Sequence, residues 1–136
     1  MARSQQASTP VDLNTPHAAA VLMGAMAELA QLWELKNDQL LTLLGLSRTT
    51  FYRFKNGEAT VGLDLATRER VSYLLRIQAA LELLLPNEQA DRWVKKPNTA
   101  PLFGGASALD RMLGGQVGDL MVVADYLDAQ RGGDFL

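Results

Sequence analysis

Asn37–Asn56 reads N-D-Q-L-L-T-L-L-G-L-S-R-T-T-F-Y-R-F-K-N, and this stretch decides the fold. Its spacing predicts a helix-turn-helix, with a first short helix over Gln39–Leu44 and a second over Arg48–Lys55. Gly45 suits the tight turn between them, and Ser47 can cap the second helix. The apolar residues expected to hold the two helices together are Leu40, Leu44, Leu46, Phe51 and Phe54.

The outward face of the second helix carries residue types that bind DNA. The N-terminal end of such a helix normally enters the major groove, so Arg48 and Thr49 are expected to contact bases. Tyr52, Arg53 and Lys55 are expected to make mixed contacts with bases and phosphates. The full candidate set for DNA contact is Ser47, Arg48, Thr49, Tyr52, Arg53 and Lys55.

The same segment has a second interpretation, a structural helical hairpin whose cationic face is merely solvated. Leu41 stands where the helix-turn-helix signature usually has a small residue, and the acidic residues Glu58 and Asp64 follow the cations closely. One such module is also a small footprint for tight, specific binding. A homodimer that reads two half-sites of operator DNA is therefore expected.

Helical patterns continue on both sides of this motif. Apolar spacings of three and four predict further helices over His17–Leu35, Leu65–Leu85, Glu88–Lys95, Ser107–Leu113 and Val117–Gln130. Asn37 or Asp38 can cap the first motif helix, and Asp64 can cap the long helix. Because neither a strand nor an internal repeat is found, the expected fold class is an all-α helical bundle.

The same periodicity predicts which side chains face the core. In the first helix these are Val21, Leu22, Ala25, Met26, Leu29, Leu32 and Trp33. In the first motif helix they are Leu40, Leu41 and Leu44. In the long helix they are Val71, Leu74, Leu75, Leu81 and Leu85, with Tyr73, Ile77, Ala80 and Leu84 beside them. In the last helix they are Val117, Leu120, Met121, Ala124 and Leu127. An apolar surface as broad as that of the long helix indicates that this helix is central or that part of it meets another subunit.

Composition narrows the class of protein. The chain has 136 residues, of which 48% are hydrophobic, enough to bury the core of one domain or of two small ones. Cysteine is absent, which excludes disulfides, thiolate catalysis and cysteine-ligated metal. The sequence contains no apolar run of membrane-spanning length and no signal-peptide pattern at its start. We expect a cytoplasmic protein that does not contact a membrane.

The net charge of −2 divides into two regions of opposite sign. The segment Ser47–Gly57 holds three cations and no acid, whereas Ala106–Leu136 holds five acids and two cations. A local basic patch can bind phosphates although the whole chain is mildly acidic, because salt screens charges more than about 10 Å apart. The division favours two partners of opposite character, although solvated helix faces would give the same pattern.

The last third of the chain is cut into two helical pieces by glycine pairs at 104–105, 114–115 and 132–133. A glycine just past a helix tolerates the left-handed closing geometry, so this punctuation indicates a compact unit. Trp93 is expected to anchor its core. Leu102 and Phe103 can serve either the core or an interface.

This region resembles the toxin-binding domain of the Xre/MbcA/ParS-like antitoxins. The matching residues are Trp93, Pro97, Asn98, Leu102, Gly104, Gly105, Leu109, Gly118, Val123, Leu127 and Gly132. The resemblance extends upstream through an Xre-like part from about Ala18, and one departure is Ala108, where the family often has proline. It implies an Xre-like helix-turn-helix region over 17–85 and a toxin-binding domain over 86–136. Residues 1–16, rich in Ser, Thr, Gln and Pro, are expected to form a flexible arm.

The resemblance also implies a partner, a RES-domain toxin that breaks down NAD and whose active-site cleft the C-terminal region covers. Asp134 and the terminal carboxylate can imitate the anionic groups of a dinucleotide, while Phe135 and Leu136 fill an apolar subsite. The expected toxin-binding residues are Asp128, Arg131, Gly132, Gly133, Asp134, Phe135 and Leu136. A frayed chain end is the alternative interpretation for the last four of them.

Little in the sequence indicates an enzyme. His17 is the single histidine, at an expected helix start, and neither a phosphate-binding glycine loop nor metal-ligand spacing is present. Neither a cofactor nor a metal is expected, and the pair Asp125 and Asp128 is expected to face solvent. The sequence therefore predicts a non-enzymatic antitoxin that blocks a toxin and represses its own operon. The alternative is a free-standing helix-turn-helix regulator without a toxin partner.

Overall fold

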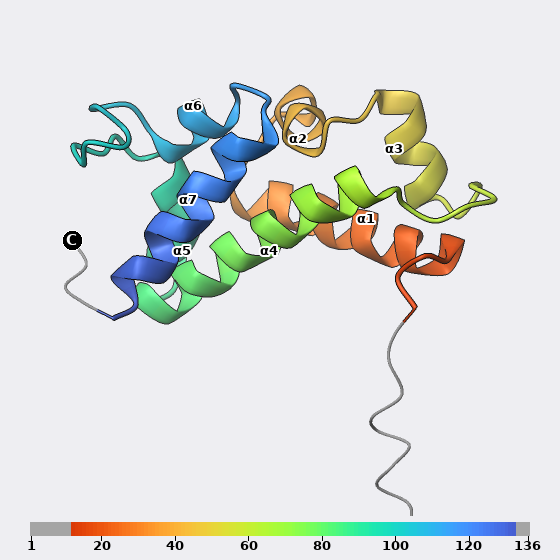
Figure 1. The fold of residues 1–136 in the computed structure, drawn as a ribbon, viewed down its shortest axis with the longest axis horizontal. Coiled ribbons are helices and arrows are strands. Elements are labelled where there is room, and N and C mark those ends of the chain that lie inside the picture. The colour runs from red at the N-terminus through yellow and green to blue at the C-terminus, as the bar shows by residue number, and fades with distance from the viewer. Residues whose placement is uncertain (1–11, 133–136) are drawn as a thin grey trace, which may run out of the picture.

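The structure is a computed structural model that describes residues 12–132, and this part of the chain is helical throughout (Figure 1). In chain order the elements are α1 (Pro16–Leu32), α2 (Asn37–Leu44), α3 (Arg48–Lys55), α4 (Leu65–Leu84), α5 (Glu88–Arg92), the 3-10 turn η2 (Trp93–Lys95), α6 (Ala108–Met112) and α7 (Val117–Gln130). Among these residues the one β-type contact is an isolated antiparallel bridge between Pro97 and Ser107. The all-α prediction is confirmed.

Local side-chain signals set the starts of most of these helices. Thr15 caps α1 by accepting a 3.0 Å hydrogen bond from the Ala18 N–H, and Pro16 occupies the first helical position. Two predicted caps are confirmed: the Ser47 hydroxyl accepts from the Thr50 N–H at 3.1 Å, and the Asp64 carboxylate accepts from the Thr67 N–H at 2.8 Å.

The start of α2 differs from the prediction that Asn37 or Asp38 caps it. Lys36 is the capping residue, and both expected caps already lie in the first turn. The Gln39 side chain instead binds the backbone at the start of the helix, by accepting a 2.8 Å hydrogen bond from the Lys36 N–H. A residue inside the first turn has helical backbone, so its side chain cannot act as the cap.

All the helices contribute buried residues to one core cluster. The buried faces of α1, α2 and α7 differ from the predicted ones. On α1 the buried residues are Ala18, Ala19, Met23, Met26 and Leu29, followed by Trp33, whereas Val21 and Leu32 are 57% and 46% exposed. On α2 Leu43 is buried and Leu41 only half-buried. On α7 Val123 takes the place predicted for Met121, which is 41% exposed. Apolar periodicity gives a helix face only to within a residue or so, and the packed neighbours decide the rest.

The long helix α4 is central, as the sequence predicts, because it packs against α2, α5 and α7. Figure 1 shows it crossing the molecule diagonally, with α7 beside its C-terminal half. Its buried residues are Thr67, Val71, Leu74, Ile77, Gln78, Ala80 and Leu81. Leu75, predicted to face the core, is 42% exposed, and Leu83 is 68% exposed. The apolar surface of α4 is therefore only partly covered within one chain.

Two glycines are required by the path of the chain. Gly45 ends α2 in the left-handed region, at φ 68°, and makes the tight turn predicted between α2 and α3. Gly62 lies where the loop before α4 passes the residues just ahead of α1, because a Cβ there would be 2.2 Å from the backbone oxygen of Asn14. The segment that leads into α1 and the α3–α4 loop are thus packed together.

The Asp64 cap gives a pH-dependent contribution to stability. Hydrogen bonds from Thr67 hold the pKa of the Asp64 carboxyl below its usual value. The stabilisation is therefore present above the unfolded-state pKa and is lost as pH falls through the folded-state pKa. We expect Asp64→Ala to lower the free energy of unfolding by about 1 kcal/mol at neutral pH. Asp64→Asn should lower it less, because the amide oxygen still accepts from the Thr67 N–H.

Urea unfolding of both variants between pH 7 and about pH 3 is the measurement, and the Ala variant should converge on wild type in acid. Glu58→Ala removes an exposed acid without a capping role and serves as the control. A cost of Asp64→Ala that does not change with pH would contradict the role of the charge.

Candidate functional site

The exposed face of α3 forms the first candidate site. The helix packs on α1 through Phe51, which is 1% exposed, and through the half-buried Phe54. The opposite face points to solvent, and all six residues predicted to contact DNA are exposed: Ser47, Arg48, Thr49, Tyr52, Arg53 and Lys55. The structure therefore brings the predicted residues together on one accessible face of α3, a helix that lies at one edge of the molecule (Figure 1).

The cations of this face have no acidic partner among the residues that the structure describes. Across residues 12–132, the side chains of Arg48, Arg53 and Lys55 take part in no ion pair or side-chain hydrogen bond. Their charge is available to phosphates. Ser47 and Tyr52 differ, because the Ser47 hydroxyl is used in capping and the Tyr52 ring packs edge-on against Phe51, with centroids 5.1 Å apart.

Arg70 of α4 supports the turn between α2 and α3. Arg70 of α4 donates to the Leu43 carbonyl at 3.2 Å and to the Gly115 carbonyl at 2.8 Å. A Cβ at Gly45 would lie 3.2 Å from the Arg70 guanidinium, so the turn packs directly on this side chain. The helix-turn-helix is thereby joined to the turn that precedes α7.

The C-terminal helices are held by three aromatic rings. Trp93 and Phe103 meet edge to face with centroids 5.8 Å apart, and Phe103 meets Tyr126 of α7 at 5.3 Å. Trp93 is 7% exposed and Phe103 6% exposed, which confirms Trp93 as a core anchor and assigns Phe103 to the core. Leu102 is half-buried against the same cluster. These contacts fix the position of α7.

The last turn of α7 carries the acidic residues that the sequence singled out. The Arg76 guanidinium of α4 binds the Asp128 carboxylate and lies 3.3 Å from that of Asp125. The Asp128 carboxylate raises the pKa of Arg76, and Asp125 adds to this effect. Asp125 is exposed, as predicted, but both acids are paired rather than simply solvated. Arg131 reaches Asp128 at 3.8 Å, so the end of α7 is a small network of charges.

Gly132 is exposed, and its backbone lies outside the left-handed region expected for a glycine that closes a helix. A Cβ on it would meet no atom within 4 Å. The remaining predicted toxin-binding residues, Gly133, Asp134, Phe135 and Leu136, lie outside the described residues.

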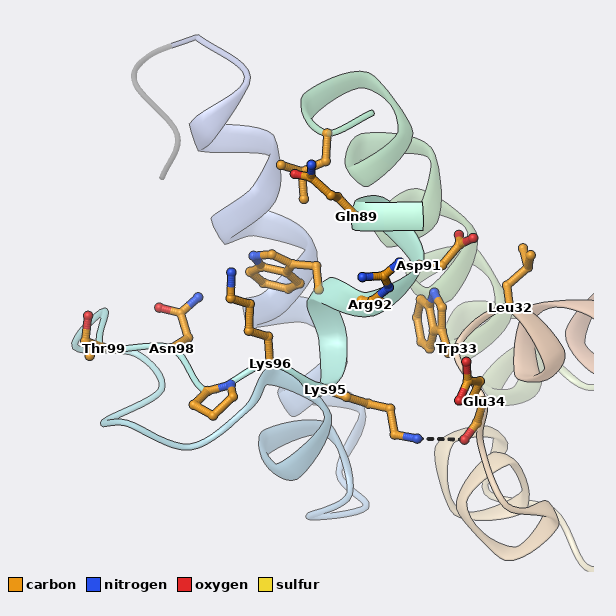
Figure 2. Close-up of a pocket in the computed structure, with 13 residues that line it drawn as sticks. Leu32, Trp33, Glu34, Gln89, Asp91, Arg92, Lys95, Lys96, Asn98 and Thr99 are labelled. Atoms are coloured by element: carbon orange, nitrogen blue, oxygen red, sulfur yellow. Dashed lines mark hydrogen bonds between the residues drawn. The ribbon is translucent and has the colours of Figure 1, made fainter. Parts of the chain in front are cut away.

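A groove of about 840 Å³ opens between the end of α1 and the segment that runs from α5 to residue 99 (Figure 2). Leu32, Trp33 and Trp93 contribute apolar surface to it, and Arg92 and Lys96 contribute charge. The Lys95 amine is occupied, because it donates to the Glu34 carbonyl at 2.8 Å. Such a groove can accept an anionic or aromatic group. Sequence analysis did not identify it, although the run R-W-V-K-K at residues 92–96 carries the signal.

Both halves of the chain match known protein families. Residues 12–76 match the antitoxin Xre-like helix-turn-helix domain, and residues 79–133 match the antitoxin Xre/MbcA/ParS C-terminal toxin-binding domain. Over 111 residues the chain is 45% identical to the uncharacterized protein y4oB of Sinorhizobium fredii, an alignment that covers 80% of this chain and 83% of that protein. The chain belongs to the Xre/MbcA/ParS antitoxin family.

Family membership gives this antitoxin two kinds of partner. The helix-turn-helix match contains α3 with its unpaired cations, which implies DNA binding, and the second match implies a toxin partner. In residues 12–132 the antitoxin has neither a helix long and apolar enough to cross a membrane nor a group of three His, Cys, Asp or Glu placed to hold a metal ion.

The α3 face predicts distinct effects of its residues on DNA binding. Arg48→Ala should weaken binding by about 1–3 kcal/mol and relax sequence preference, because a base contact is lost. Lys55→Ala should weaken binding more evenly across sequences and lower the slope of log K against log salt by about 1, because the phosphate part of its expected mixed contact is lost.

Titration of each variant against the DNA upstream of the antitoxin reading frame, at several salt concentrations, measures both effects. Arg92→Ala, which removes an exposed cation of α5 away from α3, is the matched control. An equal loss of affinity in the control would show that general charge, and not the α3 face, determines binding.

Proposed function

We propose that this antitoxin neutralises a RES-type, NAD-degrading toxin with its C-terminal region and represses its own operon with α3. The observation that carries the proposal is the division of charge on one folded chain. The cations of α3 have no ion pair within residues 12–132, whereas the acids of α7 stand near the end of the family-matched toxin-binding domain. The first surface suits an anionic partner and the second suits the cationic cleft of an enzyme that takes a dinucleotide.

In this proposal α7 is a platform and residues Arg131–Leu136 are the occluding segment. The buried residues of α7 pack it against α4, and the contact of Tyr126 with Phe103 fixes it from a second side. The exposed pair of Asp128 with Arg76 orients the Asp128 carboxylate at the end of the helix. A platform held in this way directs the following residues toward the toxin with little loss of conformational entropy on binding. Asp134 then stands for an anionic group of the dinucleotide, and Phe135 and Leu136 fill an apolar subsite of the toxin.

Asp128 and Arg131 contribute in a different way from the segment that follows. Because Asp128 already binds Arg76 and lies near Arg131, a toxin cation would have to share its carboxylate. We assign Asp128 to the orientation of the chain exit, and Arg131 to an ion pair with an acid of the toxin. Operator binding and toxin binding use opposite parts of the antitoxin, so one molecule can do both.

The test is the NAD content of cells that carry the neighbouring gene together with the antitoxin. Full-length antitoxin should preserve NAD, whereas a version stopped after Gly132 should not, because it keeps the platform and lacks the occluding segment. Far-UV circular dichroism should be unchanged by the truncation, since every residue of the aromatic cluster is retained. The truncated antitoxin should still copurify with the toxin through the platform, although more weakly than the full chain.

If both versions preserve NAD, the helices themselves inhibit and the role of the segment is wrong. If the neighbouring gene never depletes NAD, the toxin is not of the RES type, and the free-standing regulator becomes the better interpretation. A double substitution, Phe135→Ala with Leu136→Ala, tests the apolar subsite separately and should give partial loss of protection.

A further inference from the structure

One face of α4 carries two exposed leucines and is covered by no other element in the described part of the chain. Leu75 is 42% exposed and Leu83 68% exposed, and Ala79 between them is also exposed. These residues are spaced by four, so they follow one another along a single helix face. Ser72, Arg76 and Glu82, which helical geometry places on the same face, are exposed as well.

The residues of this face form a pattern that is symmetric about Ala79. Leucine stands four residues before it and four after it, as Leu75 and Leu83. Three residues before it is a cation, Arg76, and three residues after it is an acid, Glu82. A two-fold axis through Ala79 and perpendicular to the helix would bring each residue of one copy opposite its counterpart from the other end of the pattern.

We propose that α4 pairs with α4 of a second copy of the antitoxin, antiparallel and about a two-fold axis at Ala79. Leu75 of each copy then packs on Leu83 of the other, and Arg76 faces Glu82. The small Ala79 at the crossing point lets the helices approach to the 8–10 Å between axes that packed helices adopt. A two-fold interface has to be complementary to itself, and this pattern meets that condition.

The apolar contacts supply the stability of this pairing and the charges set its register. Exposed ion pairs contribute little, and Arg76 already shares its charge with Asp125 and Asp128 of its own chain. A pairing shifted by one turn would bury fewer leucines against one another and would separate Arg76 from Glu82. Binding of a toxin would not require this face to be symmetric about Ala79, whereas pairing with a second copy would. The symmetric pattern therefore favours a second copy of the antitoxin as the partner.

The pairing deepens the proposed binding of operator DNA by a dimer. The C-terminal half of α4 lies at the end of the molecule away from α3 (Figure 1), so both recognition helices stay uncovered when two copies join there. The inference rests on the proposed function only in this respect. The interface itself requires neither DNA nor toxin.

Cysteine cross-linking of the full chain tests the register directly, because the sequence contains no cysteine. At the expected separation of the helix axes, the Cα atoms of the two Ala79 residues are roughly 4–6 Å apart. A disulfide needs about 4.4–6.8 Å between Cα atoms, so the two distances are compatible. Ala79→Cys should therefore give a covalent dimer under mild oxidation. Leu65→Cys is the control, since Leu65 is 73% exposed on the same helix but lies outside the crossing.

A mixture of Leu75→Cys and Leu83→Cys chains, one of them carrying a size tag, tests the antiparallel direction. The heterodimer band should exceed the homodimer bands of either variant alone, because residue 75 faces residue 83. Homodimer bands that dominate, or a Leu65→Cys band as strong as that of Ala79→Cys, would overturn the arrangement.

Sedimentation equilibrium gives an independent readout with Leu83→Glu, which changes a side chain that contributes little to the core. Its dimer should dissociate at least tenfold more readily than the wild type, while Leu65→Glu should not change. A wild type that stays monomeric, or a dimer unaffected by Leu83→Glu, overturns the inference. Either result leaves toxin neutralisation and binding of single half-sites intact, so its failure is separate from failure of the proposed function.

Discussion

The Arg70 guanidinium connects the two working parts of this antitoxin. It donates from α4 to the Leu43 carbonyl near the end of α2 and to the Gly115 carbonyl just before α7. A cation at the end of α2 also complements the negative end of the helix dipole. Because the side chain is half-buried, loss of either hydrogen bond would leave a polar group unsatisfied, so the geometry of both turns depends on it.

A second polar side chain of α4, Gln78, also connects two other segments of the chain. Gln78, 7% exposed, accepts from the Trp33 indole at 2.7 Å and donates to Asp91 at 3.1 Å. It thus joins the end of α1 to α5. The two family matches meet between residues 76 and 79, inside α4, so the helix-turn-helix and the toxin-binding domain share one helix and are not separated by a linker.

Sequence reasoning succeeded where the signal is local. The caps at Ser47 and Asp64 and the left-handed turn at Gly45 depend on residues within a few positions of each other, and the structure has all three. The sequence predicts less well which side chains are buried, because this depends on partners that are distant in the sequence. Apolar spacing places Val21 in the core, yet it is 57% exposed and the buried face of α1 runs through Ala19 and Met23.

The groove between the end of α1 and residues 92–99 could not be predicted from the sequence for the same reason. Its walls come from residues 32–34 and 92–99, which are brought together by the fold and share no sequence period. The expected roles of single residues in binding DNA or toxin are likewise beyond periodicity, since they depend on a second molecule. What the sequence could indicate was the division of charge, because runs of like charge are visible without a fold.

The state of those charges in the fold explains why the two surfaces differ in kind. Within residues 12–132, Arg48 and Arg53 of α3 have no acidic partner, so binding a phosphate costs no existing ion pair. Asp128 of α7 is bound by Arg76, so its carboxylate is oriented before any partner arrives. Unpaired charge favours long-range attraction and salt-dependent binding, as DNA recognition requires. Paired charge favours a stiff surface, from which a short segment can be presented to a cleft with little entropy left to lose.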